Sequence, residues 1–178
     1  MIRDWTGPLV LAAALGTATF FVTLSRAPTT MMSTAWSRVS KSGANAFTHS
    51  PMATQKSRAI VRPSPDLAYS SCPFDLSAGP IAISVPPVPA RYWSLSVFQA
   101  NTDVAFVRNN VDSGGKAIDI VIAQEGQAVP PGSSAVRVKG AKGIGLIRVL
   151  VDDRGAFAPI DRARQGARCQ PITAARSG

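Results

Sequence analysis

The stretch DLAYSSCPFDLSAGPIAISVP, from Asp66 to Pro86, marks the point where the sequence changes to a period of two residues. In its second half, IAISV (81–85), the isoleucine and valine side chains alternate with small ones, as expected for a half-buried strand. The stretch also gathers a cysteine, two carboxylates and a tyrosine, which raises the question of an active site. We interpret it instead as the start of a β-sheet, with Gly79-Pro80 as a turn.

Several segments downstream repeat the strand pattern. They are RYWSLSVFQ (91–99), TDVAFVRNN (102–110), KAIDIVIAQ (116–124), AVRVKG (135–140) and GIGLIRVLVDD (143–153), and glycine- or proline-rich turn signals separate them. The spacing predicts a mainly-β fold, a small β-sandwich or jelly-roll-like domain over residues 66–178. The last segment, FAPIDRARQGARCQP (157–171), predicts a short C-terminal helix that Pro171 ends.

The N-terminus carries an apolar run, WTGPLVLAAALGTATFFVTLS (5–25), which Asp4 and Arg26 bracket. As a helix with a rise of ~1.5 Å per residue, this run would span about 30 Å, the hydrocarbon thickness of a bilayer. We therefore predict a transmembrane anchor over residues 1–27. The alternatives are a cleaved signal peptide, whose apolar region is shorter, at roughly 7–15 residues, and a buried core helix.

Residues 28–65 are predicted to form a stalk or linker with a weak helix. By the positive-inside rule, the basic residues that follow the apolar run would keep the C-terminal part of the chain in the cytoplasm. The cysteines, in contrast, favour export of that part. We expect a single-pass protein of the inner (cytoplasmic) membrane with its C-terminal domain in the periplasm.

The net charge of +9 comes from 19 basic and 10 acidic residues. Such an excess suits nucleic acid, anionic lipid or an acidic partner, or reflects a general bias towards Ala, Gly, Pro and Arg. No block of five or six like charges occurs, and no aromatic stacking motif adjoins a basic patch, so we expect no nucleic-acid partner.

Cys72 and Cys169 are the only cysteines. An even pair in a chain with an export-like segment predicts a disulfide, which would close a loop of about 100 residues; the alternatives are two inert buried thiols or a reactive thiol. The single histidine, His49, falls in the expected linker, which disfavours Cys-His, Ser-His-Asp and zinc sites. We therefore predict no catalytic residues, no metal and no cofactor.

A pocket remains a possible site. It would combine the carboxylates Asp66, Asp75 and Asp103, converging at one end of the sheet as an acid/base pair, with the aromatic side chains of Tyr69, Tyr92 and Trp93. The alternative is that each aspartate caps a turn or pairs with an arginine, and that the aromatic residues pack in the core.

Several of these pieces together resemble the bacterial domain-of-unknown-function family 1254. They are Tyr69-Ser70-Ser71, the DLSAGP of residues 75–80, Arg91-Tyr92-Trp93, VPPGSSAVRV (129–138) and IGLIRVLVDD (144–153), and the similarity covers roughly residues 63–170. The chain looks like the small membrane-anchored branch, in which the segments around Cys72 and Cys169 recur together. The resemblance implies no catalytic residues, and Gln99 stands where longer relatives have Asp. Those relatives carry a second domain that is absent from this sequence.

These features predict a membrane-anchored envelope protein that acts as a non-catalytic binding or accessory module. Its expected partners are the lipid bilayer, through residues 5–25, and a separate protein that carries the missing second domain. The alternative is a small enzyme or small-molecule binder that uses the aspartates in a β-fold pocket.

Overall fold

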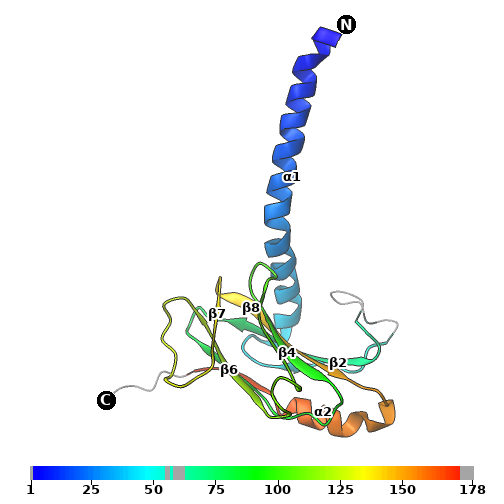
Figure 1. The fold of residues 1–178 in the computed structure, drawn as a ribbon, viewed down its shortest axis with the longest axis vertical. Helices are drawn as coiled ribbons and strands as arrows, with labels where there is room; N and C mark the ends of the chain where they lie inside the picture. Colours follow the sequence, from blue (N-terminus) through cyan, green and yellow to red (C-terminus); the bar gives the residue numbers. More distant parts are fainter. Residues whose placement is uncertain (1, 55–56, 58–62, 173–178) are drawn as a thin grey trace.

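The computed structural model describes residues 2–54, 57 and 63–172, with side chains from Trp5 onward. A long helix, α1 (Ile2–Val39), stands out from a β-rich domain, and a short helix, α2 (Phe157–Gln165), lies on the opposite side of that domain (Figure 1). The strands are β1 (Thr48–His49), β2 (Leu67–Asp75), β3 (Ile81–Val85), β4 (Trp93–Phe98), β5 (Val104–Asn109), β6 (Ile118–Gln124), β7 (Ala135–Val138), β8 (Lys142–Leu150) and β9 (Arg168–Pro171). Two 3₁₀ turns, η1 (Ser40–Ser42) and η2 (Arg154–Ala156), complete the elements.

Helix α1 is longer than the sequence suggests, because it runs through Pro28 to Val39 where a stalk with a weak helix was expected. Proline removes one backbone hydrogen bond from a helix interior, so the continuation must be held by other contacts. Trp36 supplies one, since its indole Nε1 donates to the carbonyl of Phe74 at 3.1 Å. The C-terminal end of α1 is thus attached to the β domain.

The strands form two sheets, in the orders β1-β2-β8-β4-β5 and β7-β6-β3-β9. Neighbouring strands are antiparallel except for β6 and β7, which are parallel. The longest pairing in the first sheet is between β2 and the central strand β8, which are in register from Leu67↔Leu150 to Asp75↔Lys142. This arrangement confirms the predicted mainly-β fold with an apolar N-terminal helix and a short C-terminal helix.

The core lies between the two sheets, and the two-residue period explains its composition. Ile81, Ile83 and Val85 are buried along β3, while the residues between them are half-buried. The first sheet contributes Trp93 among others, and α2 adds Ile160. Cys72 on β2 and Cys169 on β9 are joined by a disulfide with Cα atoms 6.5 Å apart, so the bond connects one sheet to the other.

Two local interpretations were wrong. Residues 168–171, expected within the C-terminal helix, form the edge strand β9, because α2 ends before Gly166 and the chain then pairs with β3. Thr48 and His49, expected in a linker, form strand β1 against β2. A two-residue strand carries too little alternation to be recognised from sequence.

Candidate functional site

The structure does not bring the six predicted pocket residues together. Asp66 directly precedes β2 and Asp75 is its last residue, so the length of this strand separates them, about 30 Å at 3.3 Å per residue. The carboxylates of Asp66 and Asp75 therefore cannot form an acid/base pair. An extended strand does not turn back, so residues at its two ends stay far apart in space even when few positions separate them in sequence.

Asp75 and Asp103 have local partners instead. The Asp75 carboxylate accepts from the backbone N–H and hydroxyl of Ser77, at 3.0 and 2.6 Å, and lies 3.6 Å from Lys142 Nζ. These hydrogen bonds to Ser77 lower the pKa of Asp75, with a smaller contribution from Lys142. Asp103 is exposed and accepts from the side-chain amide of Asn101 at 2.6 Å.

The aromatic members of the predicted pocket are also dispersed. Trp93 is 1% exposed and belongs to the core. Tyr92, its neighbour, is on the surface, and Tyr69 is half-buried, with its hydroxyl accepting from the backbone N–H of Ser64 at 3.1 Å. Adjacent residues on a strand face opposite sides, so Tyr92 and Trp93 cannot line the same cavity.

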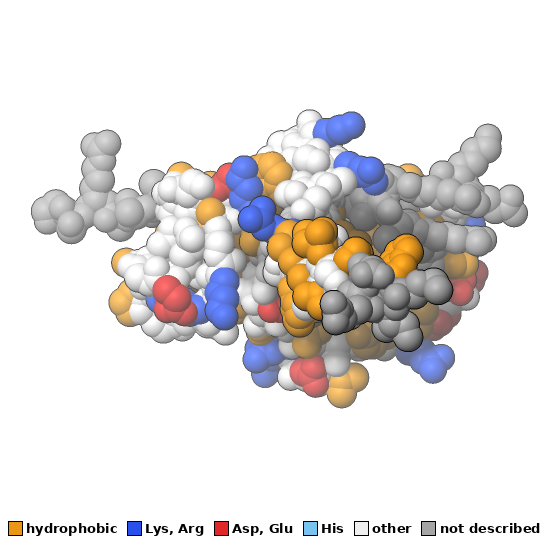
Figure 2. Space-filling view, turned by 90° about the horizontal axis from the view of Figure 1, so that it is seen from above, with side chains coloured by type: hydrophobic (Ala, Val, Ile, Leu, Met, Phe, Trp, Pro, Cys, Tyr) orange, Lys and Arg blue, Asp and Glu red, His pale blue; other side chains and the backbone are white. Residues whose placement is uncertain are grey.

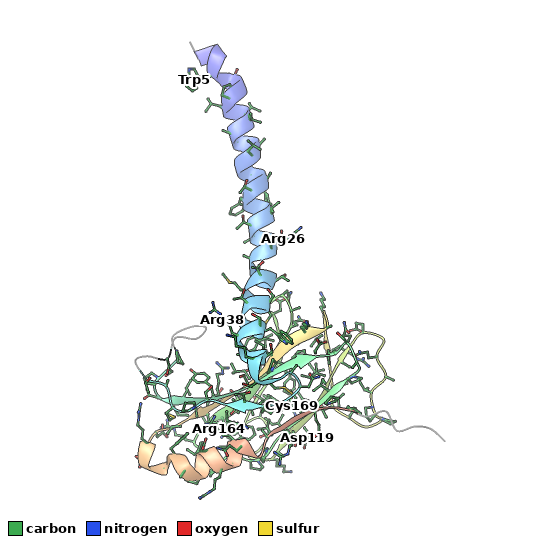
Figure 3. All side chains as sticks on the ribbon, turned by 180° about the vertical axis from the view of Figure 1, so that it is seen from behind. Trp5, Arg26, Arg38, Asp119, Arg164 and Cys169 are labelled. Carbon is green, nitrogen blue, oxygen red and sulfur yellow. A yellow bond between two sulfur atoms is a disulfide. The ribbon has the colours of Figure 1, made fainter. Side chains whose placement is uncertain are left out.

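A buried arginine forms the most extensive polar cluster among the described residues. Arg164, from α2, is 2% exposed and pairs with Asp161 on the same helix. It also donates to the carbonyl of Tyr69, the hydroxyl of Ser70 and the carbonyl of Ser50, at 2.7, 3.1 and 2.7 Å. The guanidinium therefore ties α2 to β2 and to the residue after β1, on the side of the domain opposite α1 (Figure 3).

His49 joins this cluster, although sequence reasoning left it in a linker. Its Nδ1 lies 2.8 Å from the Ser70 hydroxyl. Burial lowers the pKa of His49, and the nearby positive charge of Arg164 lowers it further. Ser70 is 0% exposed, so no substrate reaches its hydroxyl, and the serine–histidine contact serves packing rather than nucleophilic catalysis.

A groove of about 320 Å³ lies at the base of α1, where the helix meets the first sheet. Lys142 Nζ sits 4.3 Å from the centre of the Trp36 ring, a cation–π contact that joins helix to sheet. The groove is lined by Thr29, Met32, Ser33, Trp36, Ser37, Ala100 and Lys142. It holds one cation and hydroxyls that bond within their own helix, as Ser33 does to Thr30, which is no catalytic set.

Metal ligands do not gather in the part of the chain that the structure describes. No group of three or more His, Cys, Asp or Glu side chains lies close enough there to hold a metal ion. Both cysteines are in the disulfide, which removes them as thiolate ligands or nucleophiles.

Comparison with protein-family models matches residues 44–171 to "Protein of unknown function (DUF1254)". The chain belongs to the DUF1254 family. The match begins ahead of β1, which agrees with the pairing of β1 in the first sheet. A search of functionally curated proteins found no match.

Two solved structures share the fold. The crystal structure of the VPA0106 protein from Vibrio parahaemolyticus is 18% identical, with a TM-score of 0.59 over 72% of this chain and 30% of that one. A putative uncharacterized protein from Burkholderia cenocepacia is 16% identical, with a TM-score of 0.51 over 92% of this chain and 44% of that one. The chain thus spans less than half the length of either protein.

Proposed function

We propose that this DUF1254 protein is a single-pass protein of the cell envelope whose β domain is a non-catalytic binding or accessory module. In this proposal α1 crosses the inner (cytoplasmic) membrane through residues 5–25 and the β domain lies in the periplasm. The observation that carries the proposal is the apolar part of α1. The segment Trp5–Ser42 is, among the residues described, the helical stretch long and apolar enough to cross a membrane, and none of its apolar window is buried.

The disulfide supports the proposed side of the membrane. Structural disulfides persist in oxidising compartments and are rare in the cytosol. Cys72 is 0% and Cys169 is 6% exposed, and their bond connects the two sheets of the core. This is the position of a structural bond rather than of a redox-active one.

The arrangement of polar groups supports a binding role over catalysis. Asp66 and Asp75 are too far apart for acid/base chemistry, and the Ser70 hydroxyl is sealed in the core. A protein partner is part of the proposal: a separate protein similar to the parts of the longer solved structures that this chain does not match docks on the β domain. This part of the proposal is supported by the coverage, because the chain matches only 30% and 44% of the two solved chains and leaves the rest of each unmatched.

The test is carbonate extraction of native membranes followed by photo-cross-linking from the β domain. The proposal expects full-length protein in the membrane pellet and one recurrent cross-linked partner. Release of a shortened protein into the supernatant would indicate a cleaved signal peptide, and a full-length pellet protein without any recurrent partner would remove the docking part alone.

A further inference from the structure

The groove at the base of α1 is walled on one side by a single stripe of that helix. The helical residues that line it are spaced i, i+3, i+4, i+7 and i+8, namely Thr29, Met32, Ser33, Trp36 and Ser37. Residues seven positions apart lie on nearly the same face of a helix, and such steps lead back from Trp36 through Thr29 to the exposed side chains of Val22 and Leu15. The groove therefore prolongs an apolar stripe of the segment that we propose to lie in the membrane.

The opposite wall of the groove is the end of the first sheet that α1 contacts. Ala100 lies in the turn between β4 and β5, and Lys142 is the first residue of β8. The turn before β8 is bonded to this wall, since the backbone N–H of Lys139 donates to the side-chain oxygen of Gln99 at 2.8 Å. Helix α1 leaves the domain from this end of the sheet, where it contacts β2 and β8 (Figure 1).

The groove has the size and the lining for part of one acyl chain. Its volume is about 320 Å³. An apolar cavity of roughly 150 Å³ holds one benzene molecule, so the groove holds several methylene groups but not a whole two-chain lipid. Met32, Trp36 and Ala100 give it apolar surface, and the Ser33 hydroxyl already donates to the carbonyl of Thr30 at 2.9 Å. Such a lining favours an apolar occupant over a polar one.

A cation stands beside Trp36, towards the end of the groove that is farther from the apolar run. Lys142 Nζ lies over the Trp36 ring, and the Lys142 side chain is 53% exposed. Its contact with the Asp75 carboxylate is long, at 3.6 Å, and an ammonium group has three donors, so Lys142 can bond a further acceptor.

The chain around the groove carries more positive than negative charge. On the helix side, no acidic residue occurs between Asp4 and Asp66, whereas α1 and η1 carry Arg26, Arg38 and Lys41. On the sheet side, Asp75 and Asp103 accept hydrogen bonds from Ser77 and Asn101. In the view along α1, lysine and arginine side chains lie around the apolar helix (Figure 2). This distribution of charge favours an anionic head on an occupant of the groove.

Helix geometry places the groove at the bilayer surface and just beyond it. The apolar run ends at Ser25, and Thr29 and Trp36 follow it on the same helix. At 1.5 Å per residue these two positions lie about 6 Å and about 16 Å beyond Ser25 along the axis. The polar headgroup layer is roughly 5–8 Å deep on each side of the hydrocarbon core, so the groove begins within that layer and ends above it.

We propose that the groove binds the acyl chain of a single-chain anionic lipid drawn from the membrane that α1 crosses. The inference rests on the proposed membrane anchoring. The anionic head accepts a charge-assisted hydrogen bond from Lys142. The first part of the chain packs against Met32, Trp36 and Ala100, and the rest follows the stripe of α1 past Val22 into the bilayer. A two-chain phospholipid is excluded because its second chain would stand in water above the headgroups.

The test is photo-cross-linking of full-length protein in phosphatidylcholine nanodiscs. The probes are lysophosphatidylglycerol and lysophosphatidylcholine, each with a diazirine on the acyl chain a few carbons from the head, and labelled peptides are identified by mass spectrometry. The tryptic peptide of residues 92–108 contains Ala100 and no part of α1. We expect the wild type to be labelled on this peptide, several-fold more by the anionic probe than by the zwitterionic one.

Two pairs of variants separate the groove from its surroundings. Ser33→Phe fills the groove and should abolish labelling of residues 92–108. Thr34→Phe is its matched control, because Thr34 is exposed, also bonds the carbonyl of Thr30 and does not line the groove. Lys142→Gln should reduce the preference for the anionic probe by roughly three- to tenfold, whereas Lys116→Gln, at an exposed position before β6, should leave it unchanged.

Equal labelling of residues 92–108 in Ser33→Phe and Thr34→Phe would overturn the proposal, as would equal labelling of the wild type by the two probes. Labelling of this peptide in nanodiscs but not in native membranes that contain the same probe would also overturn it and assign the groove to a protein partner. Carbonate extraction separates this inference from the proposed anchoring. Protein that resists extraction but is labelled only within residues 5–25 overturns the inference alone, whereas protein released by carbonate overturns the anchoring and the inference together.

Discussion

Reduction of the Cys72–Cys169 disulfide should destabilise the β domain strongly. The bond joins residues 97 positions apart and connects the two sheets. In the chain-entropy model, a loop of this length corresponds to about 4.7 kcal/mol of stabilisation at 25 °C. For a domain of this size, that free energy corresponds to a fall of roughly 10–20 °C in the thermal midpoint.

The comparison is between oxidised and reduced wild-type protein in the same micelles, with unfolding followed in urea by tryptophan fluorescence, to which the buried Trp93 contributes. The double variant Cys72→Ala, Cys169→Ala is the control, and reductant should leave its unfolding curve unchanged. A loss below about 1 kcal/mol on reduction would refute the entropic reasoning, because the unfolded chain would then gain little freedom from opening the loop.

Three further predictions concern the polar cluster and the sheet. Arg164→Gln should lower the free energy of unfolding by about 2–4 kcal/mol, because the carbonyls that Arg164 bonds would stay buried without a donor. The control Arg162→Gln, at an exposed position, should change the free energy of unfolding by less than about 0.5 kcal/mol. Equal effects of the two substitutions in urea denaturation would contradict the stabilising role of the cluster. His49 has a folded pKa below its unfolded value of 6.5, so stability should fall as the pH drops below that value, and His49→Asn should flatten this dependence; an identical pH profile for the two proteins would disprove the assigned burial. Gly143→Ala should prevent stable folding, because a Cβ at this position would collide with the Phe74 ring and the carbonyl of Phe98. The control Gly126→Ala has open space for its Cβ and adds only the strain of a positive φ. A circular dichroism spectrum of folded protein for Gly143→Ala would contradict the close packing of β8.

Most strands were predictable because the alternation of apolar and polar side chains is a pattern within a few consecutive residues. IAISV (81–85) and AVRVKG (135–140) show the alternation that half-buried strands require, and both are strands in the structure. The cysteine pair was equally informative, since two cysteines allow one intramolecular connection. The family resemblance, expected over roughly residues 63–170, extends over residues 44–171.

What the sequence concealed depends on contacts between distant residues. The role of His49 requires β1 to pair with β2, and no local pattern in a two-residue strand predicts that pairing. Arg164 looks like any exposed helical arginine until α2 packs against β2, 95 residues away. Asp66 and Asp75, which were expected to converge at one end of the sheet, instead lie at opposite ends of β2.

We propose above that α1 anchors the protein in a membrane and holds the disulfide-bonded domain on the oxidising side of that membrane. The most direct measurement is maleimide labelling of carbonate-washed membranes, denatured in detergent so that the buried sulfurs are exposed, with and without prior reduction. We expect full-length protein whose two cysteines react with a bulky maleimide only after reduction. Full-length membrane protein that is labelled twice without reductant would place the domain in the cytoplasm and contradict the claim.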